Sequence, residues 1–110
     1  MEGGNVALVG FENLDPTESK KVEKIVAGYI KKFSESSDFE EMKLTLQIHK
    51  HGKSFKNEVI GTVFAKNGRF SANATEWNIY DAVDLVCQKM LNEAAHKAKK
   101  EQRHDKKIFK

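Results

Sequence analysis

Lysine is the residue type whose number and spacing could do chemistry in this chain of 110 residues, and that chemistry is the binding of anions. The net charge is only +3, but it is distributed unevenly. Residues 89–110 hold eight Lys and Arg against three acidic residues, a net charge of +5, which leaves −2 for residues 1–88. A basic end on a near-neutral body is typical of an edge that binds a polyanion, with nucleic acid the leading candidate. A solvated helix end has the same composition and stays the alternative.

A second group of lysines lies between residues 16 and 34. There the apolar residues Val22, Val26, Tyr29 and Phe33 follow the spacing of an amphipathic helix. The lysines fall on the other side of that helix, at Lys20, Lys21, Lys24, Lys31 and Lys32. The sequence therefore predicts a second basic surface.

Other chemistry-bearing residues are better explained by structural roles. His49 and His51 share one face of a predicted strand, a spacing that can bind zinc, but no third or fourth ligand lies nearby in the sequence. Asp81 and Asp84 suit the first turns of a helix, where the helix dipole favours acidic residues. Cys87 falls on an apolar helix stripe and is expected to be buried and inert. No catalytic triad, P-loop or dinucleotide motif is present, so the sequence predicts no enzyme, no cofactor and no metal site.

The elements that position these residues follow from periodicity and capping. Asp15 can cap a helix, Pro16 suits its first position and Glu18 has capping-box spacing. Residues 42–49 alternate between apolar and polar, as in a strand with one buried face. In chain order we expect a strand Val6–Phe11, a helix from Pro16 to about Ser34, a polar loop Glu35–Glu41, strands Met42–His49, Lys56–Lys66 and Arg69–Thr75, a helix from Asn78 to about Gln102, and a loose basic tail over residues 103–110.

The Asn67-Gly68 pair predicts a tight hairpin turn, since both residues tolerate the positive φ of a type I′ turn. With these two as the turn residues, Ala65 would pair with Phe70. One face of the hairpin is then rich in small side chains, and a helix could pack close above it. This floor consists of Val63, Ala65, Phe70, Ala72 and Ala74.

The last helix begins after Asn78, a favoured N-cap residue, and Asp81 has the capping-box spacing. Its apolar stripe is expected to cover the floor. Trp77 is expected to pack over the corner between sheet and helix, with stacking on a base as the alternative role of its ring. The stripe consists of Ile79, Val83, Val86, Met90 and Ala94.

The order β-α-β-β-β-α over one domain, residues 1–110, predicts an α+β fold. The first helix would return the chain to a parallel neighbour, and the later strands would form an antiparallel meander. We expect a four-stranded mixed sheet with both helices packed on one face and an open face around Ile60, Thr62 and Phe64. No apolar run is long enough to cross a bilayer, and a single cysteine fits a reducing compartment, so a cytoplasmic protein is expected. We also expect it to be a monomer.

The segment Asn78–Asp84 (NIYDAVD), followed by Lys89-Met90 and further lysines, resembles the last helix of the ribosome hibernation-promoting factors, also called ribosome-associated translation inhibitors. Those proteins show an acid or amide, Met or Leu, Tyr, a spacer, Ala, Ile or Val, and Asp, and then Lys-Leu with basic residues. The small-residue strand Gly68–Ala74 is also similar, and the element order agrees over nearly the whole chain. One departure is Asn92-Glu93, where family members often have Arg-Gln.

The resemblance implies a short-form factor that binds the small ribosomal subunit in the channel for mRNA and tRNA and holds ribosomes idle, as in a stress response. The C-terminal domain through which long forms dimerise ribosomes would be absent. In the family, basic helix residues contact rRNA. The matching positions here are Lys89, Lys97 and Lys100, with Lys99 and Arg103 beside them. The implied partners are the small subunit and its rRNA, with no membrane.

Two other functions stay open. A double-stranded RNA-binding domain has the same β-β-β-α ending, but its last helix usually opens with lysines, whereas this one opens with Asp81 and Asp84. A protein-interaction module would use the open sheet face around Ile60 and Phe64. Sedimentation with ribosomes would separate these alternatives from the ribosome-binding hypothesis.

Overall fold

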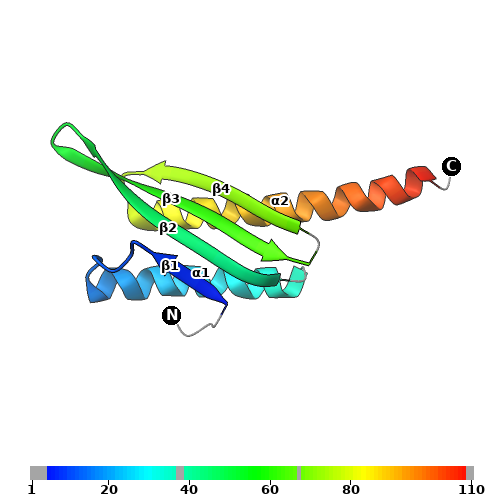
Figure 1. Cartoon of the computed structure of the whole chain (residues 1–110), viewed down its shortest axis with the longest axis horizontal. Helices are drawn as coiled ribbons and strands as arrows, with labels where there is room; N and C mark the ends of the chain where they lie inside the picture. The colour runs from blue at the N-terminus through cyan, green and yellow to red at the C-terminus, as the bar shows by residue number, and fades with distance from the viewer. Residues whose placement is uncertain (1–4, 37–38, 67, 109–110) are drawn as a thin grey trace.

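The computed structural model of the chain describes residues 5–36, 39–66 and 68–108, with backbone alone for Ser36 and residues 97–108. Its elements are β1 (Val6–Val9), α1 (Pro16–Ser36), β2 (Phe39–His51), β3 (Ser54–Ala65), β4 (Gly68–Glu76) and α2 (Ile79–Ile108). The strands form one sheet in the order β1-β2-β3-β4, in which β1 is parallel to β2 and the other pairs are antiparallel. Both helices lie on one face of that sheet, so the α+β architecture expected from the sequence is confirmed (Figure 1).

Both helices begin with the N-cap residues that the sequence predicts. The backbone N–H of Glu18 donates to Asp15 Oδ1 at 2.8 Å, and the N–H of Asp15 donates to Glu18 Oε1 at 3.2 Å, which is a reciprocal capping box. At α2, Asn78 Oδ1 accepts from the N–H groups of Tyr80 and Asp81 at 2.8 and 3.3 Å. These bonds satisfy backbone donors that no helical carbonyl can reach, so they fix where each helix starts.

The core lies between the sheet and the helices, and α2 packs directly on the small-residue floor. A Cβ atom on Gly61 of β3 would lie 2.6 Å from Val86 Cγ1 and 2.7 Å from Met90 Cε, so α2 approaches the sheet too closely for a side chain there. Phe70 is 2% exposed and is among the largest fully buried side chains. The floor is therefore confirmed as a buried face, with Ala72 at its partly covered edge.

The pairing within the hairpin differs from the expected register by two residues. Phe70 pairs with Val63 rather than with Ala65, and Ala65 pairs with Gly68. Asn67 lies outside the described residues. Because side chains alternate with a period of two, a two-residue slip changes every partner but leaves every side chain on its expected face.

Several element boundaries also differ from the expected ones. β2 begins at Phe39, so the expected loop Glu35–Glu41 is shorter, because the Phe39 ring stacks on Phe33 of α1 with centroids 6.2 Å apart. β1 ends at Val9, since Gly10 takes a φ of +84° and a Cβ atom there would lie 2.5 Å from the carbonyl oxygen of Leu46. α2 continues to Ile108, past the expected end near Gln102. The looseness expected of residues 103–110 stays a prediction.

The molecule is elongated, with principal extents of 59 × 32 × 16 Å. Figure 1 shows the β2–β3 hairpin extending past β4 at one end and α2 extending past the sheet at the other. Among the described residues, no helix is both long and apolar enough to span a membrane. Cys87 is fully buried, and burial raises the pKa of its thiol to about 12, so the thiol stays protonated as expected of an inert core residue.

Candidate nucleic-acid interface

The lysines of α1 lie on one exposed side of the helix, which we call the lysine face. All of its members are solvent-exposed: Lys20, Lys21, Lys24, Lys31 and Lys32. At the 3.6 residues per turn of an α-helix, they fall within about 120° of the circumference, on the side opposite Val22, Val26 and Phe33. The amphipathic pattern of the sequence therefore predicted this surface correctly, because burial of the apolar stripe turns the lysines outward.

A groove of about 240 Å³ runs between the lysine face and α2. Lys24 and Lys32 line one side of it and Asp84 of α2 the other, with Gly28 and Tyr29 between them. The Tyr29 hydroxyl donates to Asp84 Oδ1 at 2.8 Å, and burial together with this bond raises the pKa of Tyr29. Lys32 Nζ lies 5.0 Å from the centre of the Tyr29 ring. Two lysines against one hydrogen-bonded carboxylate leave the groove net positive.

Tyr80 and Asp84 of the NIYDAVD segment connect the two helices. The Tyr80 ring is half-buried, and Lys21 Nζ lies 5.3 Å from its centre, within the range of a cation–π contact. Asp84 accepts the Tyr29 hydrogen bond, a role that was missed when its position was assigned to the helix dipole alone. Together these contacts place the beginning of α2 beside the lysine face.

Lys89 does not join the lysine face. Its ammonium group donates to the backbone carbonyl oxygen of Asn73 on β4 at 3.0 Å. At 100° per residue, Lys89 lies about 140° around α2 from Asp84, one of the residues in contact with α1. The structure thus separates it from the α1 lysines, and its contact with rRNA stays a prediction.

The remaining candidate residues are Lys97, Lys99, Lys100 and Arg103. Their backbone belongs to α2, in the part that extends past the sheet, but their side chains lie outside those that the structure describes. They remain predictions based on charge and on the family resemblance.

The two histidines of β2 are placed on the open sheet face and not in a metal cluster. His49 Nε2 lies 2.7 Å from Glu58 Oε1, and this hydrogen bond, with one from Asn73, lowers the pKa of Glu58. Within the described residues, no group of three or more His, Cys, Asp and Glu side chains is arranged to hold a metal ion.

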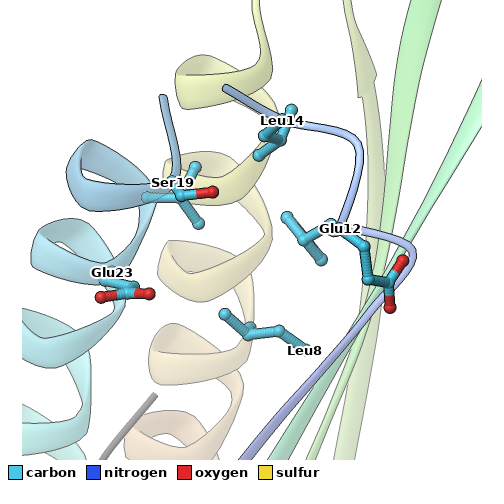
Figure 2. A pocket seen from close by; sticks show the side chains of 7 residues that line it. Leu8, Glu12, Leu14, Ser19 and Glu23 are labelled. Carbon is cyan, nitrogen blue, oxygen red and sulfur yellow. The ribbon is translucent and has the colours of Figure 1, made fainter. Parts of the chain in front are cut away.

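A pocket of about 180 Å³ lies between α1 and the loop after β1, and Figure 2 shows its lining. Leu8 and Leu14 are apolar members of its lining, while Glu12, Ser19 and Glu23 are its polar members. Two carboxylates and no cation would repel phosphate, so this pocket does not belong to a nucleic-acid interface.

Two features of the surface were not found from the sequence. Gly28 interrupts the lysine face in the middle of α1, although a Cβ atom there would meet no atom within 4 Å. Trp77 is 58% exposed, so the expected packing over the corner between sheet and helix is wrong. The basic residues around Gly52 are the sequence signal for a charged surface at this end of the molecule. Trp77 belongs to that surface, because its ring contacts His51 of the hairpin.

Comparison with solved structures identifies proteins of the same fold. No protein-family model matches the chain, and no curated protein matches it in sequence. Among solved structures, a ribosomal subunit interface protein from Coxiella burnetii is similar with a TM-score of 0.65 and 16% identity, over 84% of this chain and 96% of that one. The N-terminal domain of Protein Y from Thermus thermophilus is similar with a TM-score of 0.55 and 16% identity, over 81% and 91% of the two chains. This chain therefore has the fold of these two proteins, which is the fold that the resemblance implied.

Proposed function

We propose that this protein binds the rRNA of the small ribosomal subunit through its helices and inhibits translation by occupying the channel used by mRNA and tRNA. The observation that carries the proposal is the lysine face, five exposed cations on one side of α1. The fold shared with a ribosomal subunit interface protein supports the ribosome as the partner. The basic residues of α2, among them Lys89 and Lys97, would extend the contact.

The chemistry of this binding is electrostatic. An ammonium group that neutralises a phosphate releases condensed counterions, and this release drives association without reading sequence. The spread of Lys20, Lys24 and Lys31 over three turns of α1 suits a ribose-phosphate backbone that runs along the helix. The acid-lined pocket beside Glu12 and Glu23 is excluded from contact by its charge, so the protein would present α1 in one orientation.

Competition with mRNA and tRNA tests the proposed place of binding. Adding the protein to a cell-free translation reaction is expected to lower the yield of product, because the channel is blocked. Small subunits that already carry mRNA and initiator tRNA should bind the labelled protein at least about tenfold more weakly than vacant subunits, since all three ligands would share one site.

A base-paired RNA of similar length serves as the competitor control. If it displaces the protein from small subunits as well as mRNA and tRNA do, the protein recognises duplex RNA in general. That outcome would favour the double-stranded RNA-binding alternative over the proposal.

Gly28→Ala is expected to separate stability from binding. Glycine inside a helix costs about 0.5–1 kcal/mol relative to alanine, and a Cβ atom here meets nothing, so the variant should unfold at higher urea concentration. Binding to small subunits should nevertheless weaken, because the methyl group enters the groove between Lys24 and Lys32, where a phosphate would approach the helix.

Ser34→Ala is the matched control, since it raises helix propensity at an exposed position of α1 outside this groove. It should stabilise the protein, though by less than Gly28→Ala because serine is a better helix former than glycine, and leave binding unchanged. Equal affinity of the Gly28 variant and the wild type would show that the ligand does not enter the groove.

A further inference from the structure

The end of the β2–β3 hairpin carries a further basic surface, in addition to the lysine face and far from the extended end of α2 (Figure 1). β1 pairs with β2 only as far as Thr45, and β4 pairs with β3 only from Asn57 onward, so residues 46–56 extend past both neighbouring strands. Residues 47–57 contain no acidic residue. Their basic and titratable side chains are His49, Lys50, His51, Lys53 and Lys56.

Trp77 lies against this hairpin on the open sheet face. Lys56 Nζ is 4.8 Å from the centre of the indole ring, and the His51 ring meets it edge-on with centroids 6.1 Å apart. Asn57 Nδ2 donates to the backbone carbonyl oxygen of Trp77 at 2.9 Å, which ties the loop before α2 to β3. The indole ring thus has two neighbours, Lys56 and His51, and the backbone of Trp77 is tied to Asn57, while 58% of the residue stays exposed.

We propose that Trp77, with His51 and Lys56 beside it, is a second RNA contact that stacks on an unpaired base. A fixed, exposed aromatic ring offers a base a stacking platform, and adjacent lysines offer cations to the phosphates on either side. Lys50 and Lys53 supply further positive charge at the end of the hairpin. An acidic peptide would satisfy the lysines but would leave the exposed indole without a partner, so single-stranded RNA fits both features better.

This contact is independent of the lysine face. It lies on the sheet side, whereas Lys20 and Lys24 lie on the outer side of α1, and the helices are packed between sheet and solvent. It would let the protein bind exposed single-stranded RNA, and the proposed binding in the channel does not depend on this contact. The two proposals can therefore fail separately.

Tryptophan fluorescence reports on this site alone, because Trp77 is the one tryptophan of the chain. Titration with an oligouridylate of about ten nucleotides should quench the fluorescence, since a stacked base quenches the indole. A base-paired RNA hairpin of the same length should quench it far less, because its bases are not free to stack. A poly-glutamate peptide of equal charge tests the acidic-peptide occupant.

The affinity for a fluorescein-labelled oligouridylate, read by anisotropy, should fall about 5- to 150-fold in Trp77→Leu, the range measured for loss of one base–aromatic stack. Trp77→Phe keeps an aromatic face and should retain most of the affinity. Phe55→Leu is the matched control, because Phe55 is an equally exposed aromatic at 57% but lies on the opposite face of the hairpin. It should bind as the wild type does.

Absence of quenching, or an unchanged affinity of Trp77→Leu, would overturn the proposal. Equal quenching by the poly-glutamate peptide would show a general anion site, and an equal loss in Phe55→Leu would place the contact elsewhere; each of these also overturns it. The ribosome-binding proposal fails on a different result, namely no binding to small subunits by a protein whose Trp77 still responds to oligouridylate.

Discussion

Phe70→Ala is expected to lower the free energy of unfolding by about 3–5 kcal/mol. Phe70 is 2% exposed and pairs with Val63 at the centre of the floor on which α2 packs. Alanine would remove most of the side chain and leave a cavity that the neighbouring strands, fixed by their hydrogen bonds, can close only in part. A domain of this size is stabilised by roughly 5–15 kcal/mol, so the loss is a large fraction of the total. Urea unfolding followed by circular dichroism measures it.

Phe55→Ala is the matched control for this prediction. It removes the same side chain from the same sheet, but at a position that is 57% exposed. The expected cost is below about 1 kcal/mol, because little buried area and no cavity are involved. Equal costs for the two variants would contradict the placement of Phe70 in the core.

The sequence predicts correctly which face of each strand is buried and which residue caps each helix. Alternation places Phe70 on the buried side in either register, so the face was correct although its partner was not. The two-residue error came from assigning the turn to Asn67-Gly68. Gly68 is instead the first residue of β4 and pairs with Ala65 of β3. The early start of β2 depends on the stack of Phe39 on Phe33, a tertiary contact that local pattern does not contain.

The candidate site divides in the same way. The lysine face follows from helical spacing, which is a local property. The Tyr29–Asp84 hydrogen bond joins residues 55 positions apart, so neither residue alone indicated it. The sequence contains no signal for Gly28, because a single glycine adds neither to the apolar stripe nor to the charged side of a helix. Trp77 is expected over the corner between sheet and helix because its ring is large and mostly apolar, and its exposure depends on tertiary contacts that local pattern does not contain.

The structure also explains the segment that carried the family resemblance. Asn78 caps α2, Ile79 and Val83 are buried, and Asp84 bonds to α1. These residues maintain the fold, and the described lysines that would bind rRNA lie mainly on α1. A motif in α2 can therefore identify the architecture even where the identity to proteins of that architecture is 16%.

Replacing Lys20, Lys24 and Lys31 together with glutamate is expected to weaken binding to small ribosomal subunits roughly a hundredfold or more. The change turns attraction into repulsion where phosphates would lie, and like charges at a contact cost several kcal/mol. The fold should persist, because the three side chains are exposed and exposed substitutions change stability by about 0.5 kcal/mol or less each. Circular dichroism of the variant checks this.

Lys43, Lys66 and Arg69 provide the matched control, since all three are exposed and lie away from the lysine face, and their replacement with glutamate changes the charge equally. This control variant should bind within about threefold of the wild type, because long-range repulsion is screened over about 10 Å at 0.1 M salt.

Co-sedimentation of the wild type and these two variants with purified small subunits, over a series of salt concentrations, is the most direct test of rRNA binding through the lysine face. The wild type should pellet with the subunits, and its log K should fall with log salt by about 0.7–0.9 for each phosphate contact. The lysine-face variant should bind far more weakly, with a slope smaller by about 2 to 3. Binding that is independent of salt, or that is lost equally in both variants, would contradict rRNA binding through the lysine face.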